Sequence, residues 1–375
     1  MKIFYYETRK SWLKLSVLIT LIIFTALNFI RICPDAKTRY KLRKYTEICE
    51  IYGGEWEAEK LGDFNEKYNY INEKYLSGRL DEPGIFTDTV TDDEMLLSKI
   101  KKQIEYQYMY PNHVHSITGK AHENAELYAK TGAAFEQKSN ELIEELYADR
   151  VVFEFHGTDW AKFLFSYDFS SLLCVILLIL GTAASFSAEN ESGMMTLISA
   201  NGKTAETLIA KAASAMVYCA ILSIWFSASD ILFTYIFYTI DGVQMPIYTV
   251  ELFQNTPYNI TFLNAVFLRA GMRFIGLFCL SVLIMLTSKF CPNTMTAMFS
   301  GFIACIVLTL LAGFFKGVWN PICALYPGAY LTDFKCVNIA GTPVLMLYFV
   351  IAIMISEILI FAIMILIHER ILRRR

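Results

Sequence analysis

The residues and motifs that mark enzyme active sites are scarce in this sequence. Histidine occurs only five times in 375 residues. There is no serine nucleophile elbow, no helix with paired zinc-binding histidines and no Cys-x-x-Cys redox pair. The stretch Asn201-Gly202-Lys203-Thr204 ends like a P-loop, but Leu197 stands where the loop needs its first glycine. We therefore expect no catalytic site and no hydrolysis of ATP by this chain alone.

Three of the histidines suggest a metal site at first sight. His113, His115 and His122 lie near Glu123 in the sequence, and imidazole and carboxylate groups are common zinc ligands. No cysteine accompanies them, their spacing matches no standard zinc site, and they flank a predicted turn. The sequence therefore predicts ordinary loop histidines and no metal.

Long apolar runs dominate what the sequence does contain. Hydrophobic residues make up 55% of the chain and the mean hydropathy is +0.40. A helix of about 20 apolar residues crosses a bilayer, and six stretches reach that length. They cover residues 12–32, 163–186, 209–238, 262–288, 294–315 and 344–367. The predicted fold is an all-α polytopic membrane protein with six transmembrane helices.

The basic residues predict an orientation, because cytoplasmic ends of spans are rich in lysine and arginine. Arg9 and Lys10 precede the first span, and arginines fill the tail from Arg370 to Arg375. Both termini are therefore expected in the cytoplasm, with the first span as an uncleaved signal anchor. A basic cluster beyond the first span opposes this, but a long loop translocates largely regardless of charge. That cluster consists of Arg31, Lys37, Arg39, Lys41, Arg43 and Lys44.

A polar insert, residues 33–158, follows the N-tail and first span of residues 1–32. It contains 24 acidic and 16 basic side chains, so we expect a solvated, mildly acidic domain outside the cytoplasm. Amphipathic patterns predict helices over residues 55–76, 92–110 and 120–147. Predicted turns separate them, the last at Pro111-Asn112. Residues 159–375 then form a five-span domain.

Four of the nine cysteines fall on the predicted outer side of the membrane, where disulfides are permitted. The sequence allows Cys33 to pair with Cys49 and Cys323 to pair with Cys336. Connectivity cannot be read from spacing, so both bonds stay open. The other five cysteines are expected to be packing residues.

The link between the second and third spans, residues 186–208, has the most distinctive pattern in the chain. Two acidic residues precede a glycine, an aliphatic pair follows, and a Gly-Lys turn leads to a lysine that opens the next helix. This order resembles the link of the type 2 family of ATP-binding-cassette (ABC) exporter permeases. The matching residues are Phe186, Glu189, Glu191, Gly193, Leu197, Ile198, Gly202, Lys203 and Lys211.

The resemblance implies that this link carries a short helix that docks on a separate ATPase subunit. Glu189 and Glu191 would offer charge to a basic partner, and Met194, Met195 and Leu197 would supply an adaptable apolar patch. The alternative is that the two carboxylates only cap a helix and keep the loop solvated.

The resemblance covers the membrane part of the chain, where residues 316–343 look like an outer re-entrant region. It implies an exporter permease in a bacterial plasma membrane, paired with a second, identical or related permease. Partner ATPases would bind ATP and Mg²⁺, so this chain needs no cofactor; lipids surround it and no nucleic acid is expected. Permeases of sodium efflux and antibiotic resistance operons are similar, and a peptide, lipid, drug or ion fits as substrate. A receptor or sensor, a secondary transporter and a membrane enzyme are the alternatives.

A charged residue inside a predicted span is costly without a partner or a wet cavity. Asp230, Arg269, Arg273 and Glu357 are placed at similar depths. We therefore predict a network among them. Such a network either fixes the geometry of the bundle or takes part in substrate passage and gating.

Overall fold

A computed structural model describes residues 2–55, 57–80, 92–194, 197–198, 204–315, 320–326 and 328–374. Six segments within them are long and apolar enough to cross a membrane. They are α2 (Leu15–Ile32), the run from α7 to α9 (Asp159–Glu191), α11 (Thr204–Phe237), α12 (Phe262–Phe290), α13 (Thr294–Phe315) and α16 (Met346–Arg374). By length and composition, the six predicted spans are confirmed.

The second span is bent into three helices: α7 (Asp159–Ser166), α8 (Phe169–Thr182) and α9 (Ala184–Glu191). It extends beyond the predicted residues 163–186 at both ends. The guanidinium of Arg269 donates to the backbone carbonyls of Leu164 and Tyr167 at the first bend. These carbonyls lie where α7 ends and the regular helical pairing stops, so Arg269 stabilises the break.

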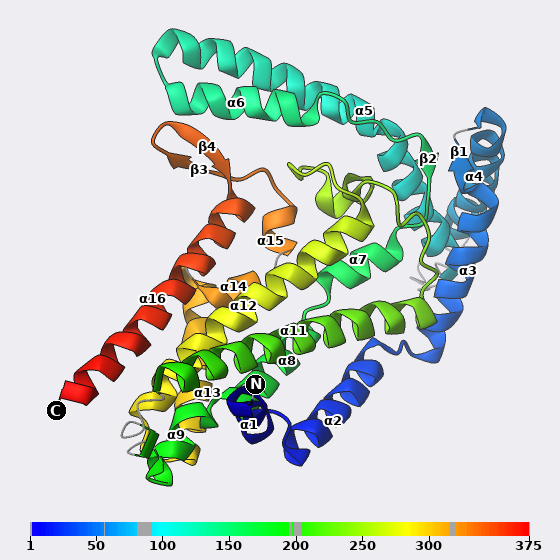
Figure 1. Ribbon diagram of the computed structural model, residues 1–375. Helices are drawn as coiled ribbons and strands as arrows, with labels where there is room; N and C mark the ends of the chain where they lie inside the picture. The colour runs from blue at the N-terminus through cyan, green and yellow to red at the C-terminus, as the bar shows by residue number, and fades with distance from the viewer. Residues whose placement is uncertain are drawn as a thin grey trace.

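Helix α12 lies at the centre of the bundle and packs against α8, α11, α13 and α16 (Figure 1). The most apolar stretch of the second span is 78% buried inside the protein, and that of α12 is 61% buried. In α2, α13 and α16 the corresponding stretch is only 17% buried. Apolar helices with so little protein around them present their surfaces to lipid or to another subunit.

A short helix, α1 (Lys2–Ser11), precedes the first span and lies against α11. Trp12 follows it and stacks on Tyr218, with ring centroids 5.3 Å apart. Gly181 makes room for that stack, because a Cβ there would lie 2.3 Å from a ring carbon of Tyr218. The N-terminal segment is therefore part of the packed bundle.

Most of the predicted outer domain is helical, formed by α3 (Ala36–Tyr52), α4 (Ala58–Leu80), α5 (Asp92–Thr131) and α6 (Ala134–Tyr147). Helices α5 and α6 form a long hairpin above the bundle (Figure 1). Strands β1 (Gly54–Glu55), directly after α3, and β2 (Glu154–Phe155), near the end of the domain, pair antiparallel. Helix α3 had no counterpart among the predicted helices.

The predicted turn at Pro111-Asn112 is wrong, because α5 continues through both residues. Tyr110 stacks on Tyr248 with ring centroids 4.9 Å apart, and Tyr110 and Val114 are both buried in one cluster. This packing offsets the cost of proline inside a helix, about 3 kcal/mol. The real turn is at Gly132, which has a φ of 75°.

The four cysteines on the predicted outer side are free thiols, so neither considered disulfide is formed. Cys33 follows the end of α2, whereas Cys49 lies in the last turn of α3. A helix rises about 1.5 Å per residue, which puts the two far beyond the roughly 6 Å between Cα atoms that a disulfide spans. Cys336 instead has its sulfur 3.6 Å from the Ser139 hydroxyl.

The segment before the last span contains two short helices, α14 (Pro321–Ala324) and α15 (Gly328–Leu331), and a β-hairpin that the sequence did not predict. Strands β3 (Cys336–Ile339) and β4 (Thr342–Leu345) pair antiparallel. Their two-residue turn, Ala340-Gly341, has positive φ at both positions, as tight hairpins require. Two 3-10 turns, Ile247–Thr249 and Glu251–Phe253, lie between α11 and α12.

Candidate functional site

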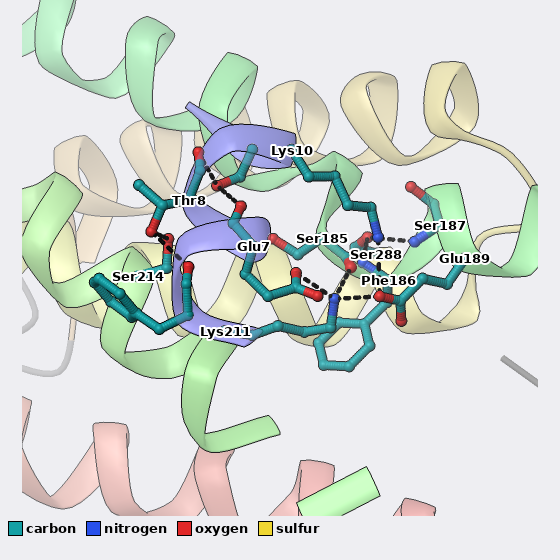
Figure 2. Close-up of polar contacts among 12 residues, drawn as sticks. Glu7, Thr8, Lys10, Ser185, Phe186, Ser187, Glu189, Lys211, Ser214 and Ser288 are labelled. Atoms are coloured by element: carbon teal, nitrogen blue, oxygen red, sulfur yellow. Dashed lines mark hydrogen bonds and ion pairs between the residues drawn. The ribbon is translucent and has the colours of Figure 1, made fainter. Parts of the chain in front are cut away.

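A cluster of charged side chains is buried where α1, α9 and α11 meet (Figure 2). The ammonium of Lys211 is 2.8 Å from a carboxylate oxygen of Glu7 and 2.6 Å from one of Glu189. It also donates to the carbonyl of Ser185 at 2.6 Å. Lys10 reaches the same oxygen of Glu189 at 2.8 Å. One lysine thus joins three segments, and all three of its donors are used.

The charges in this cluster balance: two lysines face two glutamates. The Lys211 and Glu189 side chains are each 2% exposed and that of Glu7 is 5% exposed. Buried ion pairs persist only where both partners and their hydrogen bonds are present, since an unpaired buried charge is very costly. The cluster therefore holds α1, α9 and the start of α11 in one arrangement.

Phe186 forms the floor of the cluster and is buried. The ammonium of Lys211 lies 5.2 Å from the centroid of its ring, a favourable cation–π distance. The ring packs among Ala215, Val282 and Met285. The residue that begins the predicted link is therefore an internal anchor.

Ser288 of α12 stabilises the junction between α8 and α9. Its hydroxyl accepts from the backbone N–H groups of Phe186 and Ser187, at 3.3 and 3.1 Å, and donates to the carbonyl of Ala183. The first N–H groups of a helix have no partner inside it, so Ser288 supplies what the start of α9 lacks.

Two hydroxyls and an indole fix α1 on α11. Thr8 and Ser214 lie 3.2 Å apart through their hydroxyl oxygens, and Trp12 donates from its indole nitrogen to Ser214, also at 3.2 Å. Glu7 and Thr8 were not predicted as site residues, and Lys10 contributed only to the predicted orientation of the first span. An acidic residue within the basic segment before the first span would have been the signal.

The expectation that both carboxylates of the link face a partner is wrong for this conformation. Glu189 is paired inside the protein, and Glu191 accepts from the N–H and hydroxyl of Thr294, at 3.1 and 3.0 Å. Glu191 therefore caps α13, as the alternative interpretation allowed. The chain turns at Gly193, whose φ is 67°. Of the apolar residues that follow, Leu197 is 63% exposed.

Met194 is 38% exposed beside this turn. Met195, Gly202 and Lys203 lie outside the described residues. The part of the link that the structure describes thus uses its carboxylates internally and presents apolar side chains at its surface.

The predicted charge network inside the spans is formed only in part. Asp230 and Arg273 form a buried ion pair at 3.2 Å. Asp230 also accepts from Asn28 at 2.8 Å and from Ser170 at 2.6 Å. Asn28 and Ser170 were missed, because an uncharged residue in an apolar run gives little signal. The aspartate joins α2, α8, α11 and α12.

The other two members of the expected network lie elsewhere. Arg269 binds the backbone carbonyls at the α7 bend. Glu357 of α16 lies 3.4 Å from the sulfur of Cys279, which donates to it. The expected pairing of Arg273 with Glu357 is therefore not present.

The three histidines considered as metal ligands, His113, His115 and His122, lie on helix α5 and not in a loop. His113 is 3.3 Å from the amide oxygen of Asn255, and His122 is 3.2 Å from a carboxylate oxygen of Glu144. Within the described residues, no group of three or more His, Cys, Asp or Glu side chains is arranged to hold a metal ion.

The fold defines the chain as a multi-pass helical membrane protein. Comparison with protein-family models, with curated proteins and with solved structures finds no match in any of the three. What the site does must therefore be argued from its own geometry.

Proposed function

We propose that this chain is the transmembrane permease subunit of an ATP-driven exporter, and that a separate ATPase subunit acts on α9 and the link that follows it. The observation that supports this best is the Lys211 cluster. Movement of α9 relative to α1 or α11 would separate buried opposite charges, which costs several kcal/mol. A displacement of α9 by the ATPase would therefore move α1, α9 and the start of α11 together.

The two interruptions of the second span would act as hinges for such a movement. The helix is interrupted at Ala183, where the Ser288 hydroxyl bonds to the N–H of Phe186 and to the carbonyl of Ala183. A rigid end, α9, thus connects through a hydrogen-bonded junction to the membrane-embedded α8. Hinges of this kind absorb backbone rotation at a few element ends.

The docking surface in this proposal is apolar, centred on Met194 and Leu197. Glu189 is not part of it, because its charge is neutralised inside the protein. Exposed methionine and leucine next to a turn make an adaptable contact with a partner groove. A second permease subunit completes the exporter, in a bacterial plasma membrane, with a peptide, lipid, drug or ion as cargo. The buried Asp230–Arg273 pair serves to fix the bundle.

Copurification tests this function. The chain is expressed with the ATPase gene that neighbours its own, as wild type and as Leu197→Asp. The matched control is Leu127→Asp, a leucine that is 55% exposed. It belongs to α5, a helix at the opposite end of the molecule from α9 (Figure 1). We expect the ATPase to copurify with the wild type and the control, and to be lost with Leu197→Asp.

Retention of the ATPase by Leu197→Asp would refute the proposed docking surface. If no ATPase copurifies with the wild type, the exporter proposal fails, and a receptor whose outer domain binds a ligand becomes the function to test.

A further inference from the structure

A groove runs between α2 and α11 on the surface of the bundle, with a volume of about 500 Å³. Its only polar side-chain pair is satisfied internally, because the indole of Trp225 donates to the Thr25 hydroxyl at 2.9 Å. The rest of the wall offers hydrocarbon to a ligand. It is formed by Ile22, Ala26, Phe29, Ile30 and Phe233.

The end of α2 next to α3 is strongly basic. Between residues 31 and 44 there are six lysines and arginines and one acidic residue, Asp35. The carboxylate of Asp35 accepts from the N–H of Thr38 at 3.2 Å and caps α3. Arg31, directly after the groove residue Ile30, is exposed. This end therefore carries a local positive charge beside an apolar groove.

A row of aromatic rings connects the basic end to the groove. The guanidinium carbon of Arg39 lies 5.3 Å from the ring centroid of Phe237. That ring is 5.5 Å from Phe29, which is 5.1 Å from Phe233. Phe29 and Phe233 both line the groove. Arg39 is thus held one ring away from the groove wall.

We propose that this groove binds an acyl chain of an anionic phospholipid, whose headgroup phosphate contacts Arg31 and Arg39. Planar guanidinium groups match the geometry of phosphate oxygens, and basic residues at a membrane surface attract anionic lipids. The site also explains why residues 31–44, on the predicted outer side of the membrane, are basic: bound anionic headgroups would compensate their positive charge. The inference does not depend on the proposed transport function.

A second copy of the chain fits the groove less well. A two-fold symmetric contact places the same patch on both subunits, so two basic ends would face each other across the interface. Like charges brought together oppose such a contact. A lipid supplies both the hydrocarbon and the opposite charge.

Fluorescence quenching tests the site, because Trp225 lies in its wall. The purified full-length chain is placed in phosphatidylcholine vesicles with a minor fraction of lipid carrying brominated acyl chains, as phosphatidylglycerol or as phosphatidylcholine. The contribution of Trp225 is the difference between wild type and Trp225→Phe. Each arginine near an anionic surface contributes a factor of about five to binding, so we expect clearly stronger quenching by the phosphatidylglycerol.

Three variants sharpen the test. Arg31→Gln with Arg39→Gln should remove the preference for phosphatidylglycerol. Arg31→Gln alone should lower it about fivefold and leaves the contacts of Arg39 intact. The matched control, Lys120→Gln with Lys130→Gln, removes two exposed charges from α5 and should leave the preference unchanged.

Equal quenching by both lipids in the wild type would overturn the proposal, as would a preference that survives loss of both arginines. Weak quenching by both lipids that rises when the protein is diluted into excess lipid would show that a second copy covers the groove, which also overturns it.

Discussion

Replacing Lys211 with methionine should destabilise the protein more than any exposed lysine substitution. Methionine keeps the length of the side chain but removes the charge that Glu7 and Glu189 share. Glu189 retains Lys10, whereas Glu7 would be buried without its lysine. Leaving one partner of a buried pair uncompensated costs about 3–5 kcal/mol. We expect the free energy of unfolding to fall by that amount.

The assay is denaturant or thermal unfolding of the purified protein in detergent, with Lys138→Met on α6 as the control. Lys138 is exposed, so its loss should change stability by no more than about 0.5 kcal/mol. Limited proteolysis should release α1 only in Lys211→Met, since the lysine ties α1 to α11.

A double variant separates the missing charge from the lost contact. Glu7→Met together with Lys211→Met removes one positive and one negative charge and leaves the Lys10–Glu189 pair. Apolar replacement of a buried pair is often close to neutral, so at least half of the lost stability should return. A loss below about 1 kcal/mol in Lys211→Met, or a double variant no more stable than the single one, would refute the reasoning.

Three further predictions concern the predicted outer domain. Burial alone would lower the pKa of His156, but hydrogen bonds to Glu154 and Asp241, at 3.0 and 2.6 Å, outweigh it and raise the pKa above 6.5. The protonated histidine therefore adds stability that is complete below about pH 6.5 and lost as pH rises through the raised pKa; thermal midpoints should fall from pH 6 to pH 8, and His156→Gln should flatten the profile. Burial raises the pKa of the Cys49 thiol to about 12, so maleimide should label Cys49 far more slowly in the folded than in the denatured protein, and comparable rates would contradict its burial. Pro111→Ala should raise the unfolding free energy by about 1–3 kcal/mol, because alanine restores a helical N–H inside α5; a loss of stability in chemical unfolding would show that the proline is required there.

The sequence by itself determined the membrane architecture. A run of about twenty apolar residues is stable in lipid as a helix that crosses the bilayer, because the helix satisfies its own backbone hydrogen bonds. The six spans could therefore be recognised without any contact information. The helical character of residues 92–110 and 120–147 was also evident from the amphipathic pattern, although the turn between the two helices was predicted at the wrong place. A partnership between Asp230 and Arg273 was expected from the sequence, since a charge in a span needs a partner.

The tertiary structure decided which residues meet. Glu7 and Lys211 are 204 residues apart, and no local pattern relates them. The sequence could show that Glu189 is acidic and near a glycine, but only packing shows that it points inward to two lysines. Pro111 was assigned to a turn because local rules end helices at proline, and long-range stacking on Tyr248 overrode them. Local patterns follow from short-range chain geometry, whereas burial and pairing depend on segments that the fold alone brings together.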